Sequence, residues 1–327
     1  MNGLTKMDHF ISYFEYRGMP AEINGNSLLF GQTRIPLRNG IPRFTPDQSY
    51  ASGNFSRLRE KHPRLQLDSY NGTTDRYDTI LERTKWPPAF FHGKTVLECG
   101  CGIGPDTEVL LALGARVVAV DLTSLDTALA NLGRCDDLCL VQADITDLPL
   151  RKQAFDIVFC HRVLQHTPNP AHTLRHILQF VKRDGAVFVH SYAKTLYQLF
   201  TWKYFLRPIT SRMSAQRLYK LITHYAPGAF ALTTAVSRMP QGHLINHFLV
   251  PFHNHRHHPR LNNLSDEMLI EYAIHDTFDA LSPRYDRPMS AKNIRIIAKG
   301  MLAAPFEIIE RPTITLLRTV LSSAQTA

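Results

Sequence analysis

Thr95-Val96-Leu97-Glu98, followed by Cys99-Gly100-Cys101-Gly102-Ile103-Gly104, predicts a short strand that ends in a sharp glycine-rich turn. A helix over 107–114 and an apolar strand over 116–120 follow, and Asp121 closes that strand. Glycines permit positive φ angles and close approach of a ligand to the backbone. The N-terminus of the next helix offers unpaired N–H groups to an anion, and a carboxylate at a strand end can accept both ribose hydroxyls. The stretch therefore predicts a site for an adenosine-containing cofactor.

The spacing of the glycines distinguishes between cofactors. A dinucleotide fingerprint, G-x-G-x-x-G, would need its third glycine where Pro105 stands. Glu98 would repel a pyrophosphate, but its carboxylate could contact the ammonium of an amino-acid group directly or through water. Glu98 precedes the three alternating glycines, and Asp121 ends the next expected strand. In this arrangement the chain resembles the class I S-adenosylmethionine-dependent methyltransferases. The resemblance implies S-adenosyl-L-methionine as cofactor.

Later segments resemble the other motifs of that family, densely over 90–192. Strands are expected over 138–143, 155–160 and 185–190, with a helix over 170–181 and a turn over 182–185. Near the C-terminus, a helix capped by Ser290 and a hairpin of 306–310 with 313–317 are expected. The alternation predicts a doubly wound, mostly parallel seven-stranded α/β sheet with a closing antiparallel hairpin. Within the superfamily, the chain is most similar to the small-molecule branch related to ubiquinone-biosynthesis methyltransferases.

The resemblance also implies site residues. Asp144 would accept the adenine amino hydrogen, while Ile145 packs on the ring. Tyr70 and Arg83 are further candidates for cofactor contact, with ordinary packing against the sheet as the alternative for both. The other expected cofactor-binding residues lie in the glycine turn and at strand ends: Glu98, Gly100, Cys101, Gly102, Gly104, Asp121, Leu122, Cys160 and Gln165.

Two histidines follow the fourth expected strand. His161 and His166 are candidates for the base that an acceptor hydroxyl needs. His166 has an equally good alternative role, in which it fixes its loop by a hydrogen bond to the backbone.

The length of 327 residues allows additions to one such domain. We expect a small β module over 1–54, whose Asn-Gly pairs at 24–25 and 39–40 indicate hairpins. It resembles modules that often bind zinc through cysteines, but no cysteine precedes Cys99. The cofactor-binding core is expected over 55–192, a basic helical insertion over 193–289 and a return to the sheet over 290–327.

The insertion has an unusual charge. No Asp or Glu occurs over 185–265, and the block supplies the surplus of nine positive charges of the whole chain. Because charge of one sign would repel itself, an anionic partner is the simpler interpretation. A phosphorylated or carboxylated small substrate and a lipid-linked intermediate at a membrane surface fit this pattern, and nucleic acid is less favoured. Helices are expected over 194–206 and 214–225, broken at Pro208, and Tyr192, Arg207 and Arg212 are the candidates for acceptor binding.

Histidines and cysteines offer little sign of a metal. His243 and His247 have i, i+4 spacing, but no glutamate accompanies them, and Pro251 and Pro259 favour a loop. All five cysteines lie between Cys99 and Cys160 and are expected to be reduced and buried. The N-terminus lacks the apolar core of a secretory signal, so a cytoplasmic protein is expected, with peripheral membrane contact as an option.

The sequence thus predicts methyl transfer to a small, anionic acceptor at oxygen or nitrogen by direct displacement, in which the protein mainly supplies alignment. Two alternatives are a cofactor-binding adaptor that docks nucleic acid or membrane through the basic insertion, and a nicotinamide-dependent oxidoreductase. The latter is disfavoured by Pro105 and by the lack of a Tyr-x-x-x-Lys pair.

Overall fold

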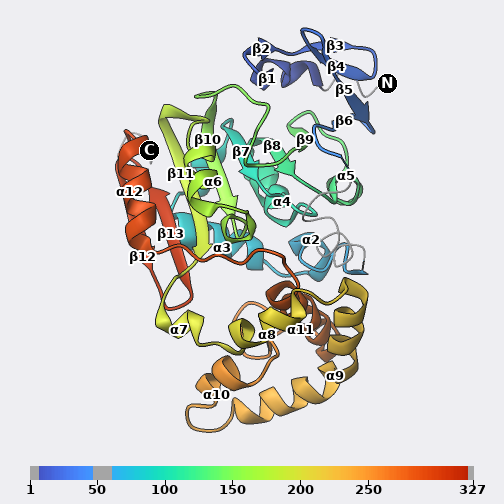
Figure 1. Ribbon diagram of the computed structural model, residues 1–327, viewed down its shortest axis with the longest axis vertical. Coiled ribbons are helices and arrows are strands. Elements are labelled where there is room, and N and C mark those ends of the chain that lie inside the picture. Colours follow the sequence, from blue (N-terminus) through green and yellow to red (C-terminus); the bar gives the residue numbers. More distant parts are fainter. Residues whose placement is uncertain (1–6, 47–60, 323–327) are drawn as a thin grey trace.

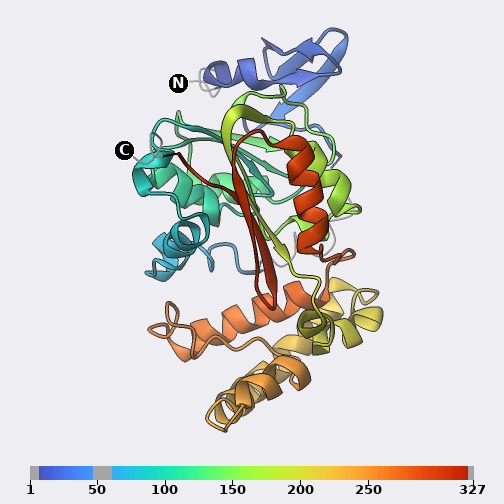
Figure 2. The same ribbon diagram turned by 90° about the vertical axis from the view of Figure 1, so that its left-hand side faces the viewer.

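The computed structural model describes residues 7–46 and 61–322. A central sheet separates two additions that lie at opposite ends of the long axis (Figure 1). The N-terminal β strands are at one end and the helices of the insertion at the other, and the view turned by 90° shows the same order (Figure 2).

The central sheet has seven strands in the order β12-β13-β11-β10-β7-β8-β9. Strands β7 to β11 run parallel to one another, while β13 runs antiparallel to both β11 and β12. This confirms the predicted mostly parallel sheet closed by an antiparallel hairpin. The bounds are β7 Thr95–Cys99, β8 Arg116–Asp121, β9 Leu138–Gln142, β10 Phe155–His161, β11 Val181–Tyr192, β12 Phe306–Glu310 and β13 Ile314–Thr319.

Both faces of the sheet are buried, because alternate strand residues pack into two separate apolar clusters. In β8, Val117 and Ala119 pack with α3, α4 and α5, whereas Val118 and Val120 belong to the cluster that includes α6 and α12. These helices are α3 Asp75–Thr84, α4 Pro105–Ala112, α5 Leu125–Leu132, α6 Pro170–Ile177 and α12 Ala291–Met301. The side chain of Ser290 caps α12, as predicted.

Strand β11 begins earlier than the sequence suggested. Phe155 pairs with Val181, and Ile157 pairs with Ala186, so the extra residues form a bulge. The predicted turn over 182–185 therefore lies within the strand, and α6 ends at Ile177.

The N-terminal region forms two small antiparallel sheets, with turns at both Asn-Gly pairs. It docks on the edge of the main sheet, where the Phe44 N–H donates to the Gln142 carbonyl at 2.8 Å. The expected boundary at residue 54 lies outside the described residues. The strands are β1 Glu15–Tyr16, β2 Met19–Pro20, β3 Glu22–Asn24, β4 Ser27–Phe30, β5 Thr33–Arg38 and β6 Ile41–Pro42.

Helices follow β11 and build an apolar core of their own, to which Leu65 also contributes. The Tyr272 hydroxyl donates to the Leu65 carbonyl at 2.7 Å and so ties this core to the segment ahead of the main domain. The helices are α7 Leu196–Leu199, α8 Trp202–Thr210, α9 Ala215–Val236, α10 Gly242–Leu249 and α11 Asp266–Leu281, and a short α2, Asp68–Asn71, lies next to them in space.

Two expectations about the insertion are wrong. Pro208 does not break α8, because contacts to α11 hold its last turn: the Thr210 hydroxyl donates to the Leu281 carbonyl at 3.1 Å. The region of His243 and His247 is the helix α10 rather than a loop, since Pro251 lies beyond its end. None of the described helices is long and apolar enough to cross a bilayer.

Candidate active site

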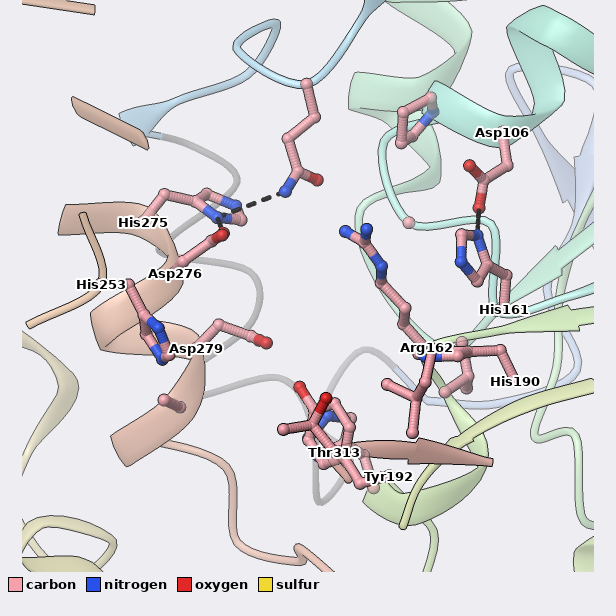
Figure 3. Close-up of a pocket in the computed structure, with 18 of the residues that line it drawn as sticks. Asp106, His161, Arg162, His190, Tyr192, His253, His275, Asp276, Asp279 and Thr313 are labelled. Carbon is pink, nitrogen blue, oxygen red and sulfur yellow. Dashed lines mark hydrogen bonds and ion pairs between the residues drawn. The ribbon is translucent and has the colours of Figure 1, made fainter. Parts of the chain in front are cut away.

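A cavity of about 490 Å³ opens at the carboxyl ends of the parallel strands. Open α/β sheets bind their ligands at this edge. The glycine turn and the ends of β10 and β11 form one wall, and α8 and α11 form the opposite one. In Figure 3, His161 and His190 lie on the side of the sheet, and His253, His275 and Asp279 face them.

The glycine turn adopts the backbone that its sequence predicts. Gly100, Gly102 and Gly104 have φ angles of 85°, 62° and 95°, a region that other residues rarely adopt. A Cβ atom at Gly100 would approach Val163 Cγ2 to 2.4 Å. Gly100, Cys101 and Gly102 line the cavity, whereas Gly104 is the N-cap of α4.

Asp121 connects the end of β8 to the glycine turn. Its two carboxylate oxygens accept the N–H groups of Gly102 and Thr123, each at 2.8 Å. A carboxylate offers about four acceptor positions, so ribose hydroxyls can share these oxygens. Asp121 and the half-buried Leu122 beside it therefore stay the residues expected at the ribose of S-adenosylmethionine.

Asp144 and Ile145 follow β9, at the same edge of the sheet. Asp144 Oδ1 accepts the N–H and the hydroxyl of Thr146, at 2.9 and 2.7 Å, and this bonding fixes the turn. Neither residue lines the cavity, and neither does Asp121. The expected adenosine-binding residues thus lie beside the cavity, and their contact with cofactor stays a prediction.

Three other expected cofactor residues are buried away from the cavity lining. Glu98 accepts the Thr107 hydroxyl at 2.6 Å, and burial, with Asp106 nearby, raises the pKa of Glu98 to about 8. It is therefore mostly uncharged at neutral pH, which weakens the expected attraction for an ammonium group. Burial raises the pKa of the Cys160 thiol to about 12, and Gln165 donates to the Arg162 carbonyl at 2.8 Å.

Tyr70 lies on α2, outside the cavity lining, and its side chain is 56% exposed. The structure does not bring it to the cavity. Arg83, the other candidate from this segment, does line the cavity, and so do Gln66 and Arg76.

His161 is held between two charged groups. Its Nδ1 lies 2.8 Å from Asp106 Oδ2, and its Nε2 lies 2.8 Å from an Arg83 nitrogen. Because a guanidinium can only donate, Nε2 must be the acceptor and Nδ1 carries the proton. Burial lowers the pKa of His161 to about 4 despite the attraction of Asp106. The one acceptor nitrogen is occupied, so this geometry argues against the expected role as base.

His166 lines the cavity and bonds to the backbone at the same time. Its Nδ1 lies 3.0 Å from the Tyr285 carbonyl, which can only accept, so Nδ1 carries a proton. The bond matches the loop-fixing alternative, yet in the neutral ring it leaves the basic lone pair on Nε2. A role as base therefore stays a prediction for His166.

The three acceptor candidates have different positions. Tyr192 lines the cavity, with Lys203 Nζ 4.1 Å from the centre of its ring. Arg207 does not, because it is buried and donates to the carbonyls of Ala280 and Pro283 at 3.0 and 2.7 Å. Arg212 is exposed and bonds to the Pro208 carbonyl one turn back. Neither Arg207 nor Arg212 lines the cavity, so their positions argue against acceptor binding by either residue.

Acidic residues from outside the acid-free block neutralise part of its charge. Lys203 pairs with the buried Asp286, and Arg260 Nη2 lies 2.5 Å from Oε2 of Glu82 on α3. The inference of self-repulsion is wrong for these residues, because it considered the block without its neighbours in space.

Sequence reasoning missed several cavity residues. Arg162 and His190 directly follow or end expected strands, so their place at the carboxyl edge was a usable signal. Asp276 and Asp279 come from α11, and only the fold shows that this helix faces the glycine turn. Asp276 Oδ2 lies 2.9 Å from His255 Nε2, and Asp276 Oδ1 lies 3.0 Å from His275 Nδ1. Within 7–46 and 61–322, no group of three His, Cys, Asp or Glu side chains is arranged to hold a metal ion.

Comparison with known proteins agrees with this geometry. Residues 97–189 match the family described as "Methyltransferase domain". This segment belongs to the class I S-adenosylmethionine-dependent methyltransferase superfamily. The matched methyltransferase segment runs from β7 to β11 and contains the glycine turn, Asp121 and both candidate histidines.

The relatives cover only this part of the chain. The ubiquinone biosynthesis O-methyltransferase of Neisseria meningitidis serogroup C is 30% identical over 145 residues, which are 42% of this chain and 53% of the relative. The enzyme of the same name from Paraburkholderia phytofirmans is 36% identical over 112 residues, 32% of this chain and 48% of the relative. The chain spans about half the length of these relatives.

A magnesium protoporphyrin IX methyltransferase from Synechocystis, solved with bound S-adenosylhomocysteine, is 15% identical with a TM-score of 0.38, over 71% of this chain and 76% of that one.

Proposed function

We propose that this protein transfers a methyl group from S-adenosylmethionine to a small acceptor bound in the cavity. The observation that supports it most is the shared wall: the glycine turn that would hold the cofactor is also one side of the cavity. A volume of about 490 Å³ is within the range of small-molecule sites. The names of the relatives favour oxygen as the accepting atom.

The residues of the chain would have separate tasks. The bound cofactor supplies an electrophilic methyl group. Asp121 would hold its ribose, Asp144 and Ile145 its adenine, and the glycine turn would approach it through backbone alone. Tyr192, at the end of β11, and Trp202, on α8 of the insertion, would exclude water from the space where the acceptor sits.

Binding of S-adenosylhomocysteine, measured by calorimetry, tests the cofactor half. Asp121→Asn is expected to weaken it about 10- to 100-fold, because hydrogen bonds to a charged group contribute roughly 1.5–3 kcal/mol. Asp137→Asn, an exposed change at the other end of the sheet, is the control and should bind normally. Unchanged affinity of the Asp121 variant would remove this residue from the site. Normal binding by the wild type without transfer to any acceptor would favour the non-catalytic adaptor.

The acceptor is proposed to carry an anionic group, which Arg162 would bind. Arg76, Arg83 and Lys203 also line the cavity, but each has a partner: Asp106 at 3.9 Å, His161 and Asp286. The guanidinium of Arg162 makes no ion pair or hydrogen bond within the described residues, and it reaches into the space between the two walls (Figure 3).

The backbone of Arg162 supports this role. Its φ of 63° is unusual for a residue other than glycine, and such strain concentrates at functional sites. Asp279 on the opposite wall would take a hydroxyl or amino hydrogen of the acceptor.

Arg162→Gln should therefore discriminate between charged and neutral acceptors. We expect the KM for 3,4-dihydroxybenzoate to rise roughly 10- to 100-fold, since the variant loses a hydrogen bond to a charged group, while the KM for catechol stays nearly constant. Arg175→Gln, on the exposed side of α6, is the matched control. Equal changes for both phenols would show that Arg162 does not recognise the anion.

Peripheral contact with an anionic membrane is proposed for the insertion. Large apolar side chains are exposed along the insertion, and the same stretch of chain carries basic residues that make no ion pair within the described residues. The apolar ones are Leu196, Phe200, Phe205, Ile209 and Leu249; the basic ones are Lys194, Arg212, Arg217, Lys220 and Arg238. Exposed apolar surface beside basic charge is typical of proteins that bind anionic lipid.

Co-sedimentation with vesicles tests this surface. The wild type should sediment with phosphatidylglycerol vesicles and much less with phosphatidylcholine, and the double change Phe205→Ser with Ile209→Ser should reduce binding several-fold. Ile296→Ser on α12 removes an equally exposed side chain from another region and should have no effect. Failure to bind either vesicle, or binding to DNA alone, would contradict the lipid assignment.

A further inference from the structure

His190 occupies the end of β11, in register with His161 of β10. Its side chain lines the cavity but is only 2% exposed, and the two rings lie 5.0 Å apart between centres. Within the described part of the chain, neither ring nitrogen has a hydrogen-bond partner. A neutral imidazole has one donor and one acceptor, and buried polar groups normally have partners. The position therefore calls for a polar group that comes from outside the chain.

Three other histidines of the cavity wall are already engaged. His161 is bonded to Asp106 and Arg83, His166 to the Tyr285 carbonyl, and His275 to Asp276. His190 differs from them because its hydrogen-bonding capacity is unused although the ring is buried at the wall that holds the glycine turn.

We propose that His190 is the catalytic residue that takes the proton from an accepting hydroxyl group, so that the acceptor is a phenol or an alcohol. This inference rests on the proposed methyl transfer. The hydroxyl donates to the unprotonated nitrogen of His190, and its proton moves there as the oxygen gains the methyl group. With the cofactor bound, the S–CH3 bond of its sulfonium would break as the O–CH3 bond forms, and the electron pair would stay on sulfur in neutral S-adenosylhomocysteine. The hydroxyl proton goes to His190, which returns it to solvent.

Burial and the surrounding charges keep the ring of His190 unprotonated. Burial holds the pKa of His190 well below its usual value, and His161, Arg83 and Arg162 lower it further. The ring is therefore uncharged at neutral pH, and its lone pair can accept a hydrogen bond from the hydroxyl. Because the same surroundings make it a weak base, it takes the proton only as the methyl group arrives and the O–H becomes strongly acidic. Arg162 lines the same cavity, so its positive charge stabilises the negative charge that develops on the oxygen.

Two phenols of different acidity provide the test. Catechol needs a base, whereas 4-nitrocatechol is already largely ionised near neutral pH. In His190→Gln, kcat for catechol should fall about 10²- to 10⁴-fold, the range for general base catalysis, and kcat for 4-nitrocatechol much less. Affinity for S-adenosylhomocysteine should change little. His166→Gln tests the competing base, and His172→Gln, an exposed change on α6, is the control.

Each other outcome has a definite meaning. Equal losses on the two phenols, or normal turnover of catechol, would overturn the role of His190, and a selective loss in His166→Gln would assign it to His166. A wild type that binds S-adenosylhomocysteine but methylates neither phenol would overturn the hydroxyl assignment. A wild type that does not bind it would overturn the proposed function itself. His190→Asn replaces the glutamine variant if thermal unfolding shows that variant to be unfolded.

Discussion

Gly102→Val is expected to fold but to show no measurable binding of S-adenosylhomocysteine. Gly102 has a φ of 62° and lines the cavity, and its N–H donates to Asp121 at 2.8 Å. The left-handed conformation costs a residue with a Cβ roughly 1–2 kcal/mol, so the turn would rearrange and Asp121 would lose a contact that positions it. Any side chain that stayed in place would occupy space at the cavity wall.

Gly72→Val separates the local strain from the effect on the site. Gly72 is also left-handed, with φ 71° and ψ 16°, but a Cβ there meets no atom within 4 Å, and the residue does not line the cavity. This variant should lose similar stability and keep its affinity. For both variants, calorimetry measures the affinity for S-adenosylhomocysteine and thermal unfolding measures the loss of stability. Normal affinity in Gly102→Val would mean that the glycine turn is only a structural turn.

The sheet could be predicted from the sequence because its signals are local. Apolar runs such as Arg116–Asp121 are buried on both faces and read as continuous β segments. The turn after β7 and the Asn-Gly hairpins depend on glycines at positions that require a positive φ, and a single sequence shows these directly. The cap at Ser290 is equally local.

Features that depend on neighbours in space could not be predicted. Pro208 seemed a helix breaker because its effect on α8 was considered without the contacts to α11 that hold the last turn. Arg207 seemed an acceptor ligand because charge counting does not reveal that two carbonyls of α11 and its C-terminal turn bind it.

The residues of the cavity likewise divide into those that the sequence predicts and those that only the fold reveals. The contribution of the sheet, from the glycine turn to His166, follows from motif order. The opposite wall with Asp279 depends on how α11 folds back over the strands, and no periodicity encodes that placement. His190 lay at a predicted strand end, but its unused hydrogen-bonding capacity appears only once every neighbour is in place.

Arg207→Glu is expected to destabilise the fold rather than to alter acceptor binding. The guanidinium is buried and supplies two carbonyls with donors, and it lies 3.9 Å from the fully buried Asp286, which Lys203 also contacts. A glutamate there would leave both carbonyls without donors and place two negative charges together. Breaking a buried charge arrangement typically costs about 3–5 kcal/mol, a large part of the stability of an ordinary domain.

Urea unfolding of Arg207→Glu and Arg212→Glu makes the matched comparison. Both changes reverse a positive charge at the end of α8, but Arg212 is exposed and bonds only within its own turn. Its variant should stay within about 0.5 kcal/mol of the wild type. If Arg207→Glu kept full stability while the KM for 3,4-dihydroxybenzoate rose, Arg207 would return to the acceptor site. The buried geometry instead makes its charge a support for α11, the helix that carries Asp276 and Asp279 to the cavity.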